Sequence, residues 1–104
     1  MANSYVTNLY PKPTTGVTDR RVTVGASAAN LVVADLNALT RYAVLDIQGG
    51  DIFVTFDGST PTTSNGHKLY NTRSYTWSAQ AAKAAKVIRS GVSDVTVHFS
   101  EFTD

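Results

Sequence analysis

No cysteine occurs among the 104 residues, which excludes a disulfide framework and a site built on thiolate metal ligands. Charge is also scarce: 16% of the residues are charged, and nine basic side chains nearly balance eight acidic ones. A formal net charge of +1 gives no overall field that would attract nucleic acid or anionic lipid. The core must therefore hold without covalent links, and we expect no nucleic acid as a partner.

Long apolar runs are missing as well, and none approaches the roughly 20 residues that a membrane-spanning helix needs. The N-terminal stretch, MANSYVTNLYPKP, lacks the basic and apolar regions of a secretory signal. We expect a soluble protein that is made in the cytoplasm and has no membrane partner. Any later export would require lysis or assembly.

The chain is rich in β-branched residues, since 14 Thr and 12 Val make up a quarter of the sequence. These side chains fit pleated surfaces better than helices, so the composition predicts an all-β protein. At this length the chain forms one domain with room for one modest core, and it gains stability by packing against other copies or partners. We therefore expect a homo-oligomer.

The most informative segment is Arg41 to Asp57, RYAVLDIQGGDIFVTFD, in which two alternating apolar stretches meet at Gly49-Gly50. Two glycines supply the positive φ angles of a tight two-residue loop, so the segment predicts an antiparallel hairpin. The predicted pairs are Gln48 with Asp51, Ile47 with Ile52, Asp46 with Phe53, Leu45 with Val54, Val44 with Thr55, and Ala43 with Phe56. One face is then apolar and is expected to be buried: Ala43, Leu45, Ile47, Ile52, Val54 and Phe56.

Shorter alternating segments predict further strands at Arg20 to Gly25, Leu31 to Val33, His67 to Tyr70, Ser74 to Trp77, and Val95 to Phe99. Residues 57–66, DGSTPTTSNG, are dense in turn-forming side chains and predict a loop. The expected architecture is a compact antiparallel β-sandwich, jelly-roll or Ig-like, spanning residues 19–104.

One short helix is predicted at Ser78 to Ile88, SAQAAKAAKVI, because serine caps a helix well and alanine has the highest helix propensity. Its apolar stripe consists of Ala81, Ala84, Ala85 and Ile88. The stripe is made of small side chains, so the helix can lie across an open end of the sandwich but cannot build a helical core.

Residues 1–18 differ from the rest, because two prolines and a glycine accompany an unusually apolar cluster that contains Tyr5, Leu9 and Tyr10. Exposed aromatic surface gains nothing in water, so the cluster is not typical of a disordered tail. We interpret the segment as an extended N-terminal arm whose Tyr5, Leu9 and Tyr10 bind a partner. The alternative, given equal weight, is that these residues cover the sheet edge of their own domain.

Motifs for catalysis or metal binding are absent from the sequence. His67 and His98 are the only histidines, and no paired metal spacing, nucleophile motif or phosphate-binding loop accompanies them. We therefore expect no enzyme activity, no cofactor, no metal and no small-molecule substrate. The basic residues are dispersed along the chain and suggest no ligand site.

Two aromatic residues, Tyr75 and Trp77, alternate on one strand and permit two interpretations. Aromatic planes can stack on sugars, which would suit a small carbohydrate-binding module. Burial in the only sizeable core is the favoured role, because both side chains share one strand face.

Three segments together carry a resemblance: YAVLDIQGGDIFVTFDGSTPTTSNGHKL, then SYTWS with an alanine and lysine helix, and finally KVIRSGVSDVTVHFSEF. They resemble small β-sandwich virion proteins encoded in the structural modules of tailed bacteriophages, over about Arg20 to Phe102. Those proteins share a VTFDG-T-PT turn, a Gly-His after it and an IR-x-G-x-x-D ending. The turn FVTFDGSTPT also resembles a hairpin of Ig-like domains appended to bacterial glycoside hydrolases, over about ten residues, which we interpret as convergence of turn chemistry.

The resemblance implies a capsid cement, or decoration, protein that binds the major capsid protein or other virion proteins and resides on the capsid surface after synthesis in the host cytoplasm. A head-neck or tail accessory role is the alternative within the virion. The carbohydrate-binding module is the alternative outside it.

Overall fold

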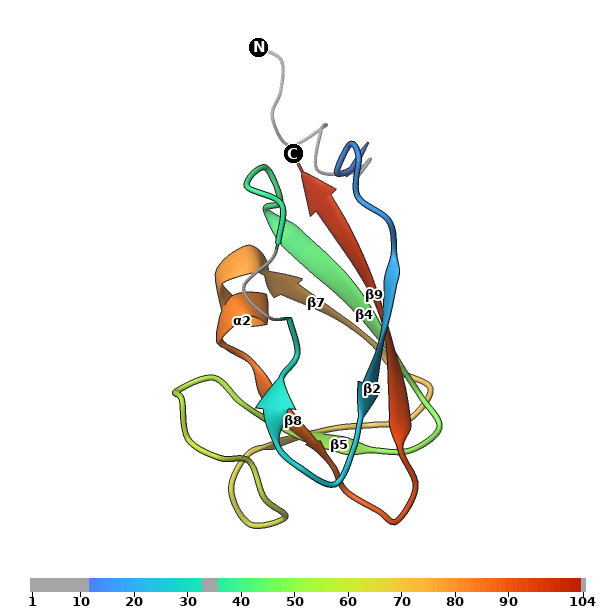
Figure 1. Cartoon of the computed structure of the whole chain (residues 1–104), viewed down its shortest axis with the longest axis vertical. Helices are drawn as coiled ribbons and strands as arrows, with labels where there is room; N and C mark the ends of the chain where they lie inside the picture. Colours follow the sequence, from blue (N-terminus) through green and yellow to red (C-terminus); the bar gives the residue numbers. More distant parts are fainter. Residues whose placement is uncertain (1–11, 33–35, 104) are drawn as a thin grey trace.

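Two antiparallel sheets, accompanied by one short helix, make up the fold of this computed structural model, which describes residues 12–32 and 36–103 (Figure 1). The apolar sides of the two sheets enclose the core. The prediction of an all-β sandwich with one short helix is confirmed.

The larger sheet has five strands in the order β1-β9-β4-β7, and β2 also pairs with β9. Its longest strand is β9, which pairs with β4 along one edge and with β2 and β1 in succession along the other. The strands are β1 (Lys12–Pro13), β2 (Arg20–Val24), β4 (Tyr42–Gln48), β7 (Ser74–Ser78) and β9 (Val95–Thr103).

The smaller sheet has four strands in the order β3-β8-β5-β6. They are β3 (Ala29–Asn30), β8 (Lys86–Arg89), β5 (Ile52–Thr55) and β6 (His67–Leu69). Strands β5 and β6 pair in antiparallel fashion, so residues 56–66 form the loop of a hairpin. The predicted loop at residues 57–66 is confirmed.

The predicted hairpin at Gly49-Gly50 is wrong. Strand β4 pairs with β7 and β9 in one sheet, whereas β5 pairs with β6 and β8 in the other. Alternation predicts which side chains of a strand lie on its apolar face, but it does not say whether two such strands lie side by side or face each other. Here they face each other, and the two glycines form a corner between the sheets.

The backbone of the corner explains why glycine occupies it. Gly49 has a φ of 97°, which L side chains rarely adopt, and a Cβ at Gly50 would lie 3.0 Å from a methyl of Val95. The amide of Gly49 donates to Asn71 Oδ1 at 2.9 Å, and the amide of Asn71 donates to Asp51 Oδ1 at 2.7 Å. These two bonds join the corner to the connection between β6 and β7, which also passes from one sheet to the other.

The predicted buried face is confirmed at five of its six positions, because Ala43, Leu45, Ile47, Ile52 and Val54 are all fully buried. Phe56 is the exception, with 37% of its surface exposed. It lies just beyond the end of β5, so no strand continues to carry it into the core. Strand β9 confirms the predicted alternation, with Val95, Val97 and Phe99 buried.

Helix α2 (Ala79–Ala84) is shorter than predicted. Its predicted start is confirmed, because the Ser78 side chain accepts a hydrogen bond from the Ala81 amide at 3.1 Å. The expected last residues of the helix instead form β8, where Val87 pairs with Val54. A β-branched residue next to a partner strand outweighs the helix propensity of the preceding alanines.

Of the predicted stripe, Ala85 is fully buried as expected, whereas Ala84 is exposed and Ala81 and Ile88 are half-buried; Ala82, which the stripe did not include, is also fully buried. The strand predicted at Leu31 to Val33 is also displaced, because β3 ends at Asn30 and Leu31 and Val32 follow it as buried residues. Val33 lies outside the described residues.

The strand pairing can be tested with engineered disulfides, since no native cysteine interferes. Val44 lies directly opposite Ser100 on β9, where cross-strand Cβ atoms are about 4.5–5.5 Å apart. We expect the double variant Val44→Cys with Ser100→Cys to form an intramolecular disulfide on oxidation, as measured by mass spectrometry. Val44→Cys with Thr55→Cys, the pair that a hairpin would join, should remain reduced, and the opposite result would contradict the corner.

Candidate functional site

The predicted partner-binding residues, Tyr5, Leu9 and Tyr10, lie outside the described residues. The structure describes the chain from Lys12, which pairs with Thr103 at the end of β9. Two residues later the amide of Thr14 donates to the carbonyl of Glu101 at 3.0 Å. The described part of the chain therefore begins at the edge of the five-stranded sheet, beside the end of β9.

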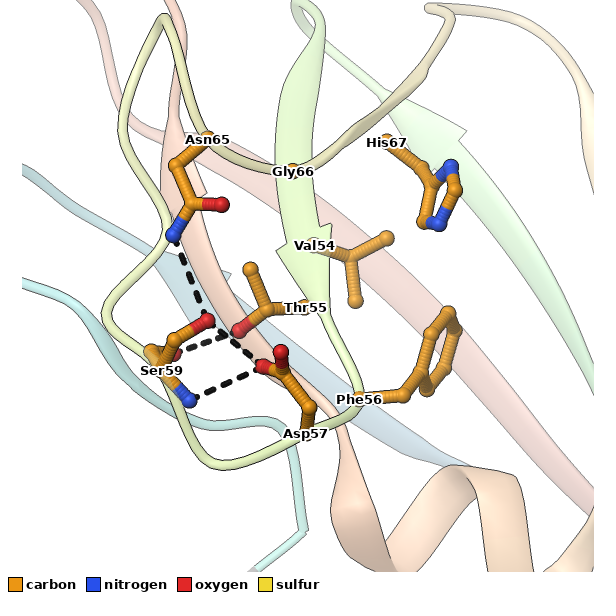
Figure 2. A pocket seen from close by; sticks show the side chains of 8 residues that line it. All are labelled: Val54, Thr55, Phe56, Asp57, Ser59, Asn65, Gly66 and His67. Atoms are coloured by element: carbon orange, nitrogen blue, oxygen red, sulfur yellow. Dashed lines mark hydrogen bonds between the residues drawn. The ribbon is translucent and has the colours of Figure 1, made fainter.

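A solvent-open hollow of about 450 Å³ lies where β5 ends and β6 begins (Figure 2). We call it the β5–β6 hollow. It is lined by Val54, Thr55, Phe56, Asp57, Ser59, Asn65, Gly66 and His67. All of these residues come from the ends of one hairpin and from its loop, so the geometry of that loop determines the shape of the hollow.

Side-chain hydrogen bonds fix the loop on one side of the hollow. Asp57 Oδ1 accepts from both the amide and the hydroxyl of Ser59, at 3.0 and 2.6 Å. Asn65 Nδ2 donates to the Ser59 hydroxyl at 3.2 Å and to a backbone carbonyl, that of Thr60, at 3.0 Å. The Ser59 hydroxyl and amide lower the pKa of Asp57, because they stabilise its ionised form.

Aromatic rings form the opposite side. The ring of Phe56 lies 6.2 Å from the ring of His67 and meets the ring of Trp77 edge-on at 5.1 Å. Trp77 belongs to β7 of the other sheet and is half-buried against the core, as is Tyr75. The core role favoured for Tyr75 and Trp77 thus agrees with their packing, and Phe56 is the more exposed ring.

Gly66 permits the close approach of the loop to β5. Its φ is 138°, and a Cβ there would lie 2.9 Å from the carbonyl oxygen of Val54. Neither the conformation nor the space suits a side chain, so the hollow depends on glycine at this position.

We expect Gly66→Ala to lower the free energy of unfolding by about 1–3 kcal/mol, because the added methyl group strains the backbone and meets the Val54 carbonyl. Gly91→Ala is the matched control, since a Cβ there meets nothing within 4 Å. Urea unfolding of both variants measures the difference. Equal stabilities would contradict the close approach.

A second polar cluster closes one end of the core around Glu101, which is only 4% exposed. Its Oε1 accepts from the Thr40 hydroxyl at 2.6 Å and from the Asn37 amide at 3.0 Å, and its Oε2 pairs with Arg20 at 2.8 Å. The cluster therefore joins β9 to β2 and to the connection that precedes β4. Within the described residues, no buried side-chain nitrogen or oxygen lacks a hydrogen-bond partner.

The pKa of Glu101 is lowered overall. Burial is the largest single influence and raises this pKa, but hydrogen bonds from Thr40, Asn37 and Arg20, with the charge of Arg20, together outweigh it. A carboxyl whose pKa is lower in the folded state stabilises the fold above the ordinary carboxyl pKa. That contribution is lost as the pH falls through the lowered value.

We expect Glu101→Gln to lower the free energy of unfolding by about 2–4 kcal/mol near neutral pH, because it removes the buried carboxylate charge that pairs with Arg20. Asp94→Asn, which removes a carboxylate paired with Arg89 but 57% exposed, should cost less than about 1 kcal/mol. Urea unfolding measures both. The difference between the native protein and Glu101→Gln should narrow as the pH falls into the acid range, and a constant difference would contradict the role of the ionised carboxylate.

The two histidines lie in different places. His67 shares the β5–β6 hollow with Asp57, without a hydrogen bond between them. His98 lies on β9 opposite Asp46 of β4, on the face turned away from the core. Residues 12–32 and 36–103 contain no group of three His, Cys, Asp or Glu side chains that could hold a metal ion.

No family model, curated protein or solved structure matches the chain. In the described part of the chain, no helix has the length and apolar character needed to cross a membrane.

Sequence reasoning did not single out the β5–β6 hollow or the Glu101 cluster. The alternation of the strand predicts Phe56 to lie in the core, and the composition of residues 57–66 predicts only a loop. The available signal for Glu101 was its position, since it follows Val95, Val97 and Phe99 at the next inward place on β9. An acidic residue at an inward place predicts a buried partner.

Proposed function

We propose that this chain is a structural protein of a tailed-bacteriophage virion, which acts as a capsid cement, or decoration, protein between major capsid subunits. The resemblance described above carries the proposal. Its three segments correspond to β4 to β6, to β7, and to β8 and β9, which pair with one another in the two sheets. The likeness therefore involves strands β4 to β9 of both sheets rather than one turn.

Broad, shallow contact suits this role. The outer face of the four-stranded sheet carries half-buried Phe53 and Ile88, which lie opposite each other on β5 and β8. Lys68 lies beside them, with its Nζ 5.9 Å from the Phe53 ring. A face with an apolar centre and a charged margin has the composition of many protein interfaces.

The N-terminal arm is the proposed anchor. Tyr5, Leu9 and Tyr10 would bury apolar surface on the capsid, while the segment from Lys12 onward is held on β9. Many copies on one shell would act through multivalency, so the affinity of a single copy need not be high. The protein would work as a binding protein without a reaction centre, cofactor or small-molecule substrate, and as an oligomer on the particle.

Electron microscopy of purified virions tests the proposal. We expect density for the sandwich at repeated positions between major capsid subunits. Density confined to the neck or the tail would replace the cement role with the accessory role. Particles that contain no copy of the chain would contradict a virion function altogether.

Deletion of residues 1–10 tests the arm and leaves Lys12 and β1 in place. We expect the truncated protein to keep the unfolding midpoint of the full chain but to lose binding to particles that lack their own copy, as measured by co-sedimentation. Val92→Ser, which removes a 91% exposed apolar side chain elsewhere, is the control and should bind normally. Undiminished binding of the truncated protein would contradict the arm.

A further inference from the structure

Two oxygen atoms of the β5–β6 hollow have no hydrogen-bond partner among the described residues. Asp57 uses Oδ1 for both bonds from Ser59, which leaves Oδ2. Asn65 uses Nδ2 for Ser59 and for the Thr60 carbonyl, which leaves Oδ1. A carbonyl only accepts, so the Thr60 contact fixes which end of the Asn65 amide donates. Both remaining atoms are acceptors.

The placement of these acceptors defines a site with two unlike walls. Figure 2 shows Asp57 and Asn65 on one side of the hollow and the rings of Phe56 and His67 on the other. Trp77 supports the Phe56 ring from the second sheet, and 37% of Phe56 remains exposed. Aromatic ring faces attract cations that approach within about 6 Å.

The charge of the hollow is negative. Asp57 is the only carboxylate in its lining, and its lowered pKa keeps it ionised through the neutral range. The neighbouring cation is Lys86, whose Nζ donates to the Gly58 carbonyl at 3.2 Å, and it forms no ion pair with Asp57 in the described part of the chain. The hollow thus combines a carboxylate that forms no ion pair with the described residues, a fixed amide oxygen and an aromatic wall.

We propose that the β5–β6 hollow binds the cationic end of a basic side chain, with arginine preferred, from the protein surface that this chain covers; the identity of that surface rests on the proposed function. A guanidinium group brings only donors and a plane that stacks on rings, which matches a lining of acceptors and rings. A sugar hydroxyl also accepts, and among the side chains that line the hollow only the imidazole of His67 offers a donor not already used in the loop.

Titration of the isolated full chain with N-acetyl-arginine amide, followed by amide NMR shifts, tests the site directly. We expect saturable shifts centred on residues 54–67, with a dissociation constant in the millimolar range that weakens as salt is added. The neutral citrulline analogue has the same shape and should bind about tenfold more weakly.

Asp57→Asn keeps the oxygen that accepts from Ser59, so the loop should remain folded, while it removes the charge and replaces the Oδ2 acceptor by an amide NH2 group. It should weaken arginine binding by about three- to fivefold. Asp19→Asn, which changes another exposed carboxylate outside the hollow, is the matched control and should bind like the native protein. Unchanged melting temperatures show that both variants are folded.

Equal binding of arginine and citrulline, an undiminished affinity of Asp57→Asn, or shifts produced by monosaccharides instead of arginine would each overturn the inference. Shifts that depend on protein concentration alone would assign the hollow to a second copy of the chain and overturn it too. Particle binding separates this inference from the proposed function. If the native protein does not bind capsids, the proposed function fails. If native protein and Asp57→Asn bind capsids equally, only the proposal that the hollow binds a basic side chain is overturned.

Discussion

The structure depends on the apolar faces of β4 and β5 meeting across the core instead of lying side by side. Leu45 and Val54 are both fully buried, yet they belong to different sheets that the chain joins at Gly49-Gly50. Because the chain passes from one sheet to the other at this corner, one alternating segment contributes core-facing side chains to both sheets. The neighbours of the two strands are therefore different: β4 pairs with β9 and β7 in one sheet, and β5 pairs with β8 and β6 in the other.

Polar side chains around Glu101 close one end of the core. At the end of the core near Arg20, the inward face of β9 continues past Phe99 to Glu101, which is only 4% exposed. A buried carboxylate is costly without partners, but here Arg20, Thr40 and the Asn37 amide satisfy it. The same contacts attach β2 and the connection before β4 to the central strand. The cluster therefore holds β2 and the connection before β4 in place against β9.

The sequence predicts which side chains of a strand face the core, but it does not predict which strands pair with each other. The alternation of β4, β5 and β9 correctly predicted which side chains are buried, because burial depends on local spacing of two residues. The hairpin was wrong because a glycine pair permits a turn within one sheet and a corner between two, and only distant strands decide between them. The same limit applies to β8, where Val87 pairs with β3 and β5, so tertiary pairing makes residues 86–88 a strand although the predicted helix extends through them. The β5–β6 hollow was not predictable, since it requires Trp77 of one sheet to meet Phe56 of the other.

The hollow itself follows from where β5 stops. Ile52, Val54 and Phe56 occupy successive inward positions, but the strand ends at Thr55, so the third side chain projects at the rim of the sandwich rather than into it. Trp77, an inward residue of the edge strand β7, reaches the same rim and supports that ring. The loop must then return to β6 within eleven residues, 56–66, and side-chain hydrogen bonds of Asp57 and Asn65 hold it together. These bonds use Oδ1 of Asp57 and Nδ2 of Asn65. Oδ2 of Asp57 and Oδ1 of Asn65 are not used. An aromatic ring and unused oxygens are therefore brought together by ordinary requirements of strand ending and loop closure, so the proposed site for a basic side chain needs no dedicated domain.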